Sequence, residues 1–225
     1  MSFHEDLLQR AAPVLDKVIG HPFWTGLRDG SVPAECLTHF VVQDTEHLLP
    51  AYARALASTA AAAVEDGHTR LLARSVIGSL EARDRLRDAY QELAADLSAP
   101  APPEPNTSEP APATRAYASF FLASASASVE AGVGALLPMV VFNQRVSQNL
   151  LDNHVPGSRY ARWIEVYHPG PHYGYAVAGF LRMVDEVGAG TGAVGRQQLV
   201  GHFQTAVRYE WAFAEAARQR SAWPS

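Results

Sequence analysis

The chain of 225 residues contains a single cysteine, Cys36. One thiol cannot close an internal disulfide and cannot alone form a cysteine-based zinc site, so both kinds of stabilised fold are excluded. Lysine is equally scarce, since Lys17 is the only one among 18 basic residues, and the formal net charge is −5. An acidic total without a basic cluster argues against a nucleic-acid partner.

Long apolar runs are also missing. No uninterrupted apolar stretch approaches the roughly 20 residues that a membrane-spanning helix needs. The first six residues lack the basic stretch followed by an apolar one that marks a signal peptide. Hydrophobic residues make up 48% of the chain and charged residues 18%, a balance typical of globular proteins. We therefore expect a cytoplasmic protein without a membrane partner, with a single domain spanning residues 1–225.

Helical spacing of apolar residues dominates what is present. Ser2 and Glu5 form a capping-box pattern ahead of an apolar face, which predicts a helix over residues 3–19. Further helices are predicted over about 31–64, 67–97, 114–128, 133–152, 157–167, 171–188 and 192–220, and none over 21–30. Pro50 should kink the second of these, because proline removes a backbone hydrogen bond and crowds the preceding turn. Signals for strands are few, so the predicted fold class is all-α, a helical bundle.

One segment cannot be regular. Residues 98–113 (SAPAPPEPNTSEPAPA) hold six prolines, which predicts a mobile surface loop biased to extended polyproline conformations. We do not interpret it as a linker between domains, because neither half of the chain alone closes a bundle.

Short motifs occur along most of the chain in a fixed order. The first group comprises His21-Pro22-Phe23, Gly30, Val32-Pro33, Phe40, Gln43-Asp44, Leu48 and Ala53-Arg54-Ala55. The later groups comprise Tyr117, Phe120-Phe121-Leu122, Ala135-Leu136-Leu137-Pro138, Tyr160, Trp163-Ile164, Tyr167, Tyr209-Glu210 and Phe213. In order and spacing these motifs resemble the TenA family of the thiaminase II type, over about residues 5–220.

The resemblance implies a helical bundle like that of haem oxygenase but without haem, usually assembled as a homotetramer. It also implies hydrolysis of the C–N bond between an aminopyrimidine methylene group and a thiazolium or amine leaving group, with no cofactor. Asp44 would then hold the exocyclic amine of the pyrimidine, and Glu210 would handle the proton on its ring. Tyr117 and Tyr167 would line the pocket.

Three positions depart from the pattern of that family. Its nucleophilic cysteine directly follows the Leu-Leu-Pro stretch, where this chain has Met139. Asn143 stands where tyrosine is common, and His47 where the family has Tyr or Phe. A thioether has no ionisable hydrogen, so Met139 cannot act as an activated nucleophile. Relatives without the cysteine are assigned to a later salvage step, and we expect Met139, Asn143 and His47 to contact the substrate.

Asp44 also stands out from the residues themselves. It lies within a predicted helix whose apolar neighbours face inward, where an unpaired carboxylate is costly. Asp44 and His47 are three residues apart, so both can point at one cavity. The alternative is a hydrogen bond between these two side chains that stabilises the helix near Pro50.

Glu210 lies between Tyr209 and Trp211. Burial of a carboxyl group among aromatic side chains raises its pKa, which suits it to acid–base catalysis near neutral pH. The alternative is a peripheral ion pair with Arg208 or Arg218.

A metal site was also considered. Relatives with this fold bind two iron ions, and bundles usually supply such ligands as Glu and His in one helical turn. Here the corresponding positions are Arg83 and Arg87, and a guanidinium group cannot ligate a metal. The histidines at 154, 168 and 172 have no carboxylate at a suitable spacing. We expect no metal.

Three functions remain open at this point. The first is a TenA-like hydrolase that acts on an aminopyrimidine or another flat heteroaromatic amine, with Asp44 and Glu210 as catalytic residues. The second is an enzyme of the same fold that has diverged into specialised metabolism. The third is a non-catalytic protein that binds a small molecule. Alanine-rich stretches at 60–63 and 123–127 permit close helix contacts, and we expect a homo-oligomer, either a tetramer or a dimer.

Overall fold

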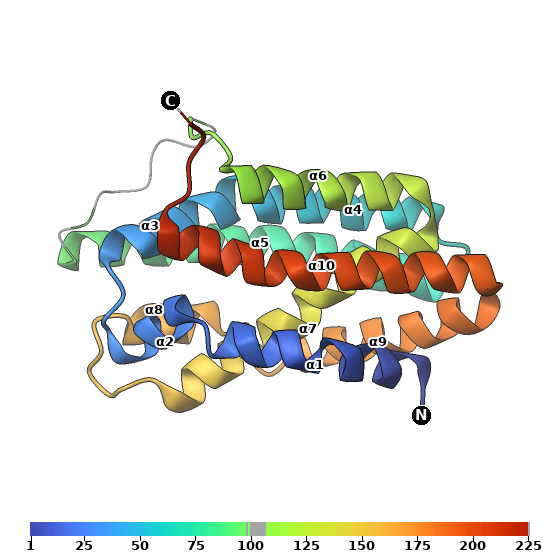
Figure 1. Ribbon diagram of the computed structural model, residues 1–225, viewed down its shortest axis with the longest axis horizontal. Helices are drawn as coiled ribbons and strands as arrows, with labels where there is room; N and C mark the ends of the chain where they lie inside the picture. The colour runs from blue at the N-terminus through green and yellow to red at the C-terminus, as the bar shows by residue number, and fades with distance from the viewer. Residues whose placement is uncertain (98, 100–106, 225) are drawn as a thin grey trace.

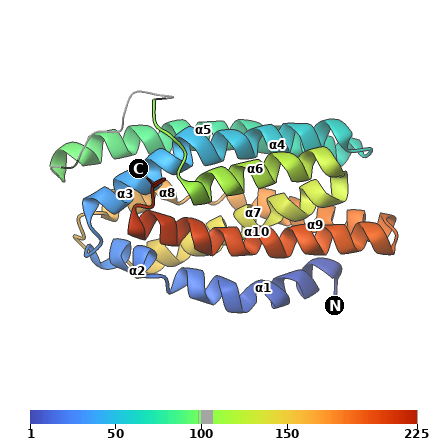
Figure 2. The ribbon, with the colours of Figure 1, turned by 45° about the horizontal axis from the view of Figure 1, so that its top comes forward.

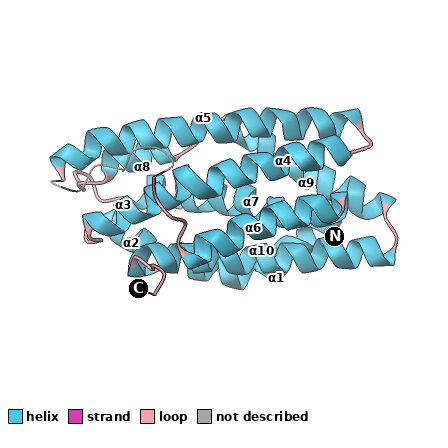
Figure 3. Ribbon diagram, turned by 90° about the horizontal axis from the view of Figure 1, so that it is seen from above, coloured by secondary structure: helices cyan, strands magenta, loops and turns pink. Residues whose placement is uncertain are grey.

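The computed structural model describes residues 1–97, 99 and 107–224, which form helices and connecting segments only (Figures 1 and 3). In chain order the helices are α1 (Phe3–Ile19), α2 (Pro22–Asp29), α3 (Ala34–Gln43), the π-helical turn η1 (Asp44–Leu48), α4 (Leu49–Ala62), α5 (Asp66–Asp96), α6 (Pro112–Ala127), α7 (Val129–Asn153), α8 (Ala161–Tyr167), α9 (Tyr173–Gly190) and α10 (Ala193–Gln219). The long helices lie side by side in an elongated bundle (Figure 1). The prediction of an all-α bundle is confirmed.

The first helix begins where its sequence predicts. The Ser2 hydroxyl accepts a hydrogen bond from the backbone N–H of Glu5, and the Glu5 carboxylate accepts one from the N–H of Ser2 at 2.7 Å. This reciprocal capping satisfies two backbone donors that a helix start otherwise leaves open. Leu7 and Val18 are buried, and they direct α1 against α9 and α10 (Figure 2).

The prediction that residues 21–30 contain no helix is wrong, because α2 occupies Pro22–Asp29. His21 caps it by accepting a hydrogen bond from the N–H of Phe23 at 3.2 Å, and Pro22 fits the first turn since its missing donor is not needed there. Gly30 ends the helix at a φ of 82°, a left-handed conformation that favours glycine. The tertiary contacts of buried Trp24 and Leu27 stabilise so short a helix.

The interruption expected near Pro50 takes the form of a π-helical turn. The backbone N–H of Leu49 donates to the carbonyl of Asp44, five residues back. Pro50 has no N–H, and its ring crowds the carbonyl four residues before it, so the wider bonding of η1 accommodates it. The chain then continues directly into α4, which packs against α5, α6 and α7 (Figures 2 and 3).

Two further boundaries differ from the prediction. The helix predicted over 157–167 begins only at Ala161, because Gly157 adopts a φ of 80° within a turn. Half of the proline-rich segment, residues 98 and 100–106, lies outside the described residues. Its last part, 107–111, is an extended connection that contacts η1, and Pro112 already belongs to α6.

The packing of α7 against α10 brings together helices that line the site described below. A Cβ on Gly134 of α7 would approach the carbonyl oxygen of Leu199 of α10 to 2.3 Å, so glycine permits this close contact. Pro138 also lies within α7, in its buried middle. Within the described residues, no helix has both the length and the apolar composition required to cross a membrane.

Candidate active site

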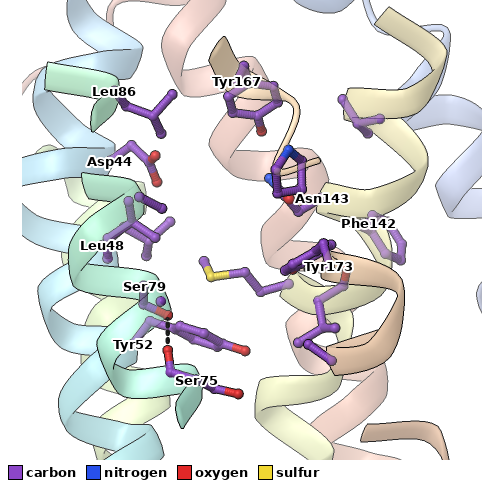
Figure 4. A pocket seen from close by; sticks show the side chains of 18 of the residues that line it. Asp44, Leu48, Tyr52, Ser75, Ser79, Leu86, Phe142, Asn143, Tyr167 and Tyr173 are labelled. Carbon is purple, nitrogen blue, oxygen red and sulfur yellow. Dashed lines mark hydrogen bonds between the residues drawn. The ribbon is translucent and has the colours of Figure 1, made fainter. Parts of the chain in front are cut away.

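A cavity of about 520 Å³ lies in the bundle between η1 and α5 on one side and α7, α8 and α9 on the other (Figure 4). This volume is in the usual range for sites that bind small molecules. Its polar lining includes Asp44, Asn143 and Glu210, and its apolar lining combines aromatic and aliphatic residues. The exposed side chains of Arg74, Glu81 and Arg85 on α5 also line it.

Asp44 is the first residue of the π-turn and is only 7% exposed. Its carboxyl group points into the open space toward the side on which Asn143 and Tyr167 lie (Figure 4). Neither carboxyl oxygen has a hydrogen-bond partner among the described residues, so the predicted alternative of a bond to His47 is not observed. Burial, with a further contribution from the charge of Glu210, raises the pKa of Asp44 to about 7.

Glu210 of α10 lines the same cavity, and the accessible part of its side chain lies there. The buried hydroxyl of Tyr117 donates a hydrogen bond to Oε1 of Glu210 at 2.7 Å. Desolvation raises the pKa of Glu210 to about 7, although the bond from Tyr117 opposes this. The alternative of an ion pair with Arg208 or Arg218 is not observed, and Arg218 pairs with Glu215.

The two carboxyl groups therefore share one cavity, and neither forms an ion pair with a basic side chain of the described residues. Near neutral pH one of them can hold a proton while the other is ionised, since like charges in a desolvated site disfavour a second ionisation. Such a pair can accept hydrogen bonds from an amine and can also transfer a proton. The site therefore suits a ligand that is cationic or rich in N–H donors.

Aromatic side chains form much of the remaining wall. Tyr167 of α8 stacks on Trp163 with ring centroids 4.8 Å apart, and Trp24 of α2 lies 5.6 Å from Tyr167. Phe40 of α3 and Phe213 of α10 pack against each other at 5.4 Å. Flat apolar walls of this kind bind planar rings by stacking and edge contacts.

Most aromatic residues of the lining were not predicted as site residues, among them Trp24, Tyr52 and Tyr173. The hydroxyls of Tyr52 and Tyr173 donate to backbone carbonyls of α7, those of Leu136 at 3.2 Å and Val140 at 3.3 Å. Burial raises the pKa of both tyrosines, so they remain protonated near neutral pH. In the sequence, the only indication that Trp24 belongs to the site is the motif next to it, at residues 21–23. No motif includes Tyr173.

Met139 and Asn143 lie one turn apart on α7, and both line the cavity as predicted from the sequence. Asn143 hydrogen-bonds the hydroxyl of Tyr167, which partly offsets the rise in the pKa of Tyr167 caused by burial. Cys36 is not in the lining, and its thiol contacts the carbonyl of Arg218 at 3.3 Å. Among the described residues, the cavity therefore has no cysteine.

The structure does not bring His47 together with these residues. Its Nε2 lies 2.9 Å from the hydroxyl of Ser108, on the outer side of η1. The reason is the π-turn, because its wider spacing keeps residues four apart on one face and moves residues three apart away from each other. Asp44 and Leu48 line the cavity, whereas His47 does not. Tyr117 lies behind Glu210 and reaches the site only through that carboxyl group.

The positions considered for iron ligands hold ion pairs. Arg83 contacts Asp84, and Arg87 contacts Glu46 at 3.2 Å. Within the described ranges, no cluster of three or more His, Cys, Asp or Glu side chains has a geometry suited to a metal ion.

The sequence is similar to known proteins over nearly its whole length. The family model of TENA/THI-4/PQQC matches residues 8–220. Relatives from Bacillus subtilis and Halalkalibacterium halodurans, each named aminopyrimidine aminohydrolase, are 26% and 27% identical to the chain. The alignments cover 99% of this chain in both cases and 92% and 98% of the relatives.

Solved structures show the same fold. A TenA homologue from P. horikoshii has a TM-score of 0.78 at 24% identity, covering 97% of this chain and 99% of that one. A domain of unknown function with a heme oxygenase-like fold, from Shewanella denitrificans, has a TM-score of 0.69 at 11% identity, covering 96% and 92%. The fold is therefore haem-oxygenase-like, and the chain belongs to the TENA/THI-4/PQQC family.

Proposed function

We propose that this protein is a hydrolase that cleaves a C–N bond of an aminopyrimidine or a related heteroaromatic amine, as in thiamin salvage. The observation that carries the proposal is the pair of carboxyl groups, Asp44 and Glu210, which share a cavity with aromatic walls and form no ion pair within the part of the chain that the structure describes. The two relatives named aminopyrimidine aminohydrolase support it at the level of the family.

Asp44 and Glu210 have distinct roles in this proposal. The unpartnered carboxyl group of Asp44 accepts hydrogen bonds from the exocyclic amine of the ring. Oε1 of Glu210 already accepts the hydrogen bond from Tyr117. The second carboxyl oxygen of Glu210 therefore interacts with a ring nitrogen or with the reacting water. Tyr167 and Asn143 line the opposite wall, and Met139 contributes an apolar contact.

The reaction requires water as the nucleophile. The water oxygen forms a bond to the methylene carbon, the C–N bond breaks, and the amine leaves with a proton. One carboxyl group, in its ionised form, takes a proton from the water, and the other, in its protonated form, gives one to the departing amine. Pairs with one shared proton near neutral pH are suited to both tasks.

Met139 limits which leaving group is possible. Without a thiolate at this position, the enzyme cannot form the covalent adduct through which a thiazolium departs readily. We therefore expect very slow cleavage of thiamin and faster hydrolysis of a smaller aminopyrimidine that carries an aminomethyl or amide group.

A second candidate is an enzyme of the same fold that acts on a different heteroaromatic amine. Met139 and Asn143 in the lining favour it, since both differ from the residues that the family resemblance implies. A binding protein without catalysis is the third candidate, and the assay below separates it from both enzymes. We also propose that residues 1–225 form one domain and assemble as a tetramer or a dimer.

The test is a hydrolysis assay with an aminomethyl-substituted aminopyrimidine and with thiamin, in which the released amine and the hydroxymethyl product are quantified. We expect turnover of the first compound and almost none of the second. Binding of the first without turnover would support a binding protein. If neither compound binds at millimolar concentration, the thiamin-salvage function is wrong and the diverged enzyme takes its place.

A further inference from the structure

The outer side of the π-turn is held by a short segment, residues 108–111, which we call the strap. The Ser108 hydroxyl donates a hydrogen bond to the carboxylate of Glu46, and the same oxygen lies 2.9 Å from Nε2 of His47. Burial lowers the pKa of His47, so its neutral ring donates here through Nε2–H. One serine therefore joins two residues of η1.

Gln43, the residue before Asp44, binds the strap through both ends of its amide. Its Nε2 donates to the carbonyl of Glu109 at 3.2 Å, and its Oε1 accepts from the N–H of Ala111 at 2.7 Å. Gln43 is 5% exposed, and such a bidentate contact fixes both its position and its orientation. The indole of Trp223 donates to the carbonyl of Pro110 at 3.0 Å, which ties the strap to the end of the chain.

A third contact joins η1 to α5. The Glu46 side chain is 2% exposed, and its carboxylate contacts the guanidinium of Arg87 at 3.2 Å. The side chains of Gln43, Glu46 and His47 thus all form contacts on the outer side, whereas the side chain of Asp44 has no hydrogen-bond partner among the described residues. These contacts all act on η1. Its i→i+5 hydrogen bonding is irregular and depends on stabilisation by the surrounding residues.

A desolvated carboxyl group gains free energy by turning toward water. Pro50 already prevents regular α-helical bonding here, so the contacts on the outer side fix how η1 is rotated, and a rotation would change the direction of Asp44 relative to the cavity. We propose that Gln43, Glu46 and His47 are positioning residues for Asp44, and that the strap fixes them so that the carboxyl group points into the cavity. This inference rests on the proposed function, since that function assigns Asp44 to the amine of the substrate.

The first test needs no substrate. The side-chain carboxyl of Asp44 is titrated by ¹³C NMR in the wild type, in Ser108→Ala, in Ser108→Ala/Gln43→Leu, and in Ser108→Thr, which keeps the hydroxyl. Neither Ser108 nor Gln43 carries a charge, so every variant keeps the charged groups of Glu46, Arg87 and Glu210. Ser126→Ala is the matched control, because Ser126 is an exposed serine of α6 that bonds only its own helix, at the carbonyl of Leu122.

We expect the Asp44 midpoint to fall by about one pH unit or more toward its ordinary value in the double variant, since a released carboxyl group hydrates. Ser108→Thr and Ser126→Ala should titrate like the wild type. An unchanged midpoint in a folded double variant would overturn the proposal. Should the double variant not fold, Ser108→Ala alone decides, with a shift in the same direction supporting the proposal and no shift overturning it.

The second test uses the aminomethyl-substituted aminopyrimidine. We expect kcat/KM to fall about tenfold in the double variant, and to fall no further when the same changes are made in Asp44→Asn, because the strap acts through Asp44. An equal loss in both backgrounds would overturn the positioning role. If the wild type does not turn over this compound, the proposed function fails, whereas the titration of Asp44 still decides the role of the strap.

Discussion

Two glutamates five residues apart on α10 have opposite surroundings. Glu215 is 20% exposed and accepts two hydrogen bonds from Arg218, each at 2.7 Å, and one from Nε2 of His21 at 2.9 Å. The bonds from Arg218, together with those from His21 and Gln219, lower the pKa of Glu215 to about 2. Glu215 thereby joins the C-terminal part of α10 to the start of α2.

Glu210 has no basic partner among the described residues, and desolvation raises its pKa to about 7. On this one helix, hydrogen-bond partners compensate the charge of Glu215, whereas the charge of Glu210, beside the cavity, is not compensated. This difference is the reason why we propose Glu210 as the functional one of the two, because an uncompensated desolvated carboxyl is costly unless a ligand uses it.

The largest effect that we expect is on turnover. Glu210→Gln keeps the shape and the bond from Tyr117 but removes the exchangeable proton, so kcat should fall by roughly 100-fold or more. The matched change Glu215→Gln on the same helix should leave kcat within about twofold, measured at a temperature where both variants are folded. Equal losses in the two variants would contradict the distinction.

Asp44→Asn should weaken binding of the aminopyrimidine about tenfold or more. A charged, desolvated hydrogen bond is typically worth about 1.5–3 kcal/mol, and the amide oxygen provides only a neutral acceptor. Calorimetric titration of both proteins measures the difference, and unchanged affinity would exclude contact between Asp44 and the amine.

The two glutamates should also affect stability in opposite directions as pH changes. The raised pKa values of Asp44 and Glu210 predict that the contribution of these two groups to stability is highest below their ordinary values of 3.8 and 4.5 and falls as pH rises to about 7. Urea titrations across this range should show a fall in the free energy of unfolding of a few kcal/mol. In Glu210→Gln this fall should be smaller, and an unchanged slope would show that Glu210 titrates normally.

Glu215 should do the reverse. Its lowered pKa means that its contribution is present above pH 4.5 and is lost as pH falls toward about 2. Glu215→Gln should lower the free energy of unfolding by about 1–2 kcal/mol at pH 7 and have little effect at pH 2. The same urea titrations provide the measurement, and a loss that persists at pH 2 would mean that packing, rather than charge, is responsible.

Much of the fold could be predicted from the sequence because helical periodicity and caps are local. The start of α1 followed from Ser2 and Glu5, and the family motifs marked Asp44 and Glu210. The structure places both at one cavity. What failed was non-local: α2 is stabilised by tertiary contacts, and Gly157 delays the start of α8.

The site shows the same division. The prediction that Asp44 and His47 share a face assumed regular α-helical spacing, and the π-turn before Pro50 invalidates that assumption. Trp24 and Tyr173 reach the cavity from α2 and α9, at positions that only the three-dimensional packing brings together. The ion pair of Arg218 with Glu210 that the sequence left open is not formed, and Arg218 instead pairs with Glu215, three residues before it on the same helix.

Asp44 and Glu210, which have no basic partner among the described residues, form the proposed binding site for an aminopyrimidine. Calorimetric titration of the wild-type protein with an aminomethyl-substituted aminopyrimidine at pH 7 tests it most directly, with Asp44→Asn/Glu210→Gln and Glu215→Gln as comparisons. We predict saturable binding to the wild type and to Glu215→Gln, and at least a 100-fold weaker affinity in the double variant. Absence of binding to the wild type at millimolar concentration, or equal affinity in all three proteins, would contradict the claim.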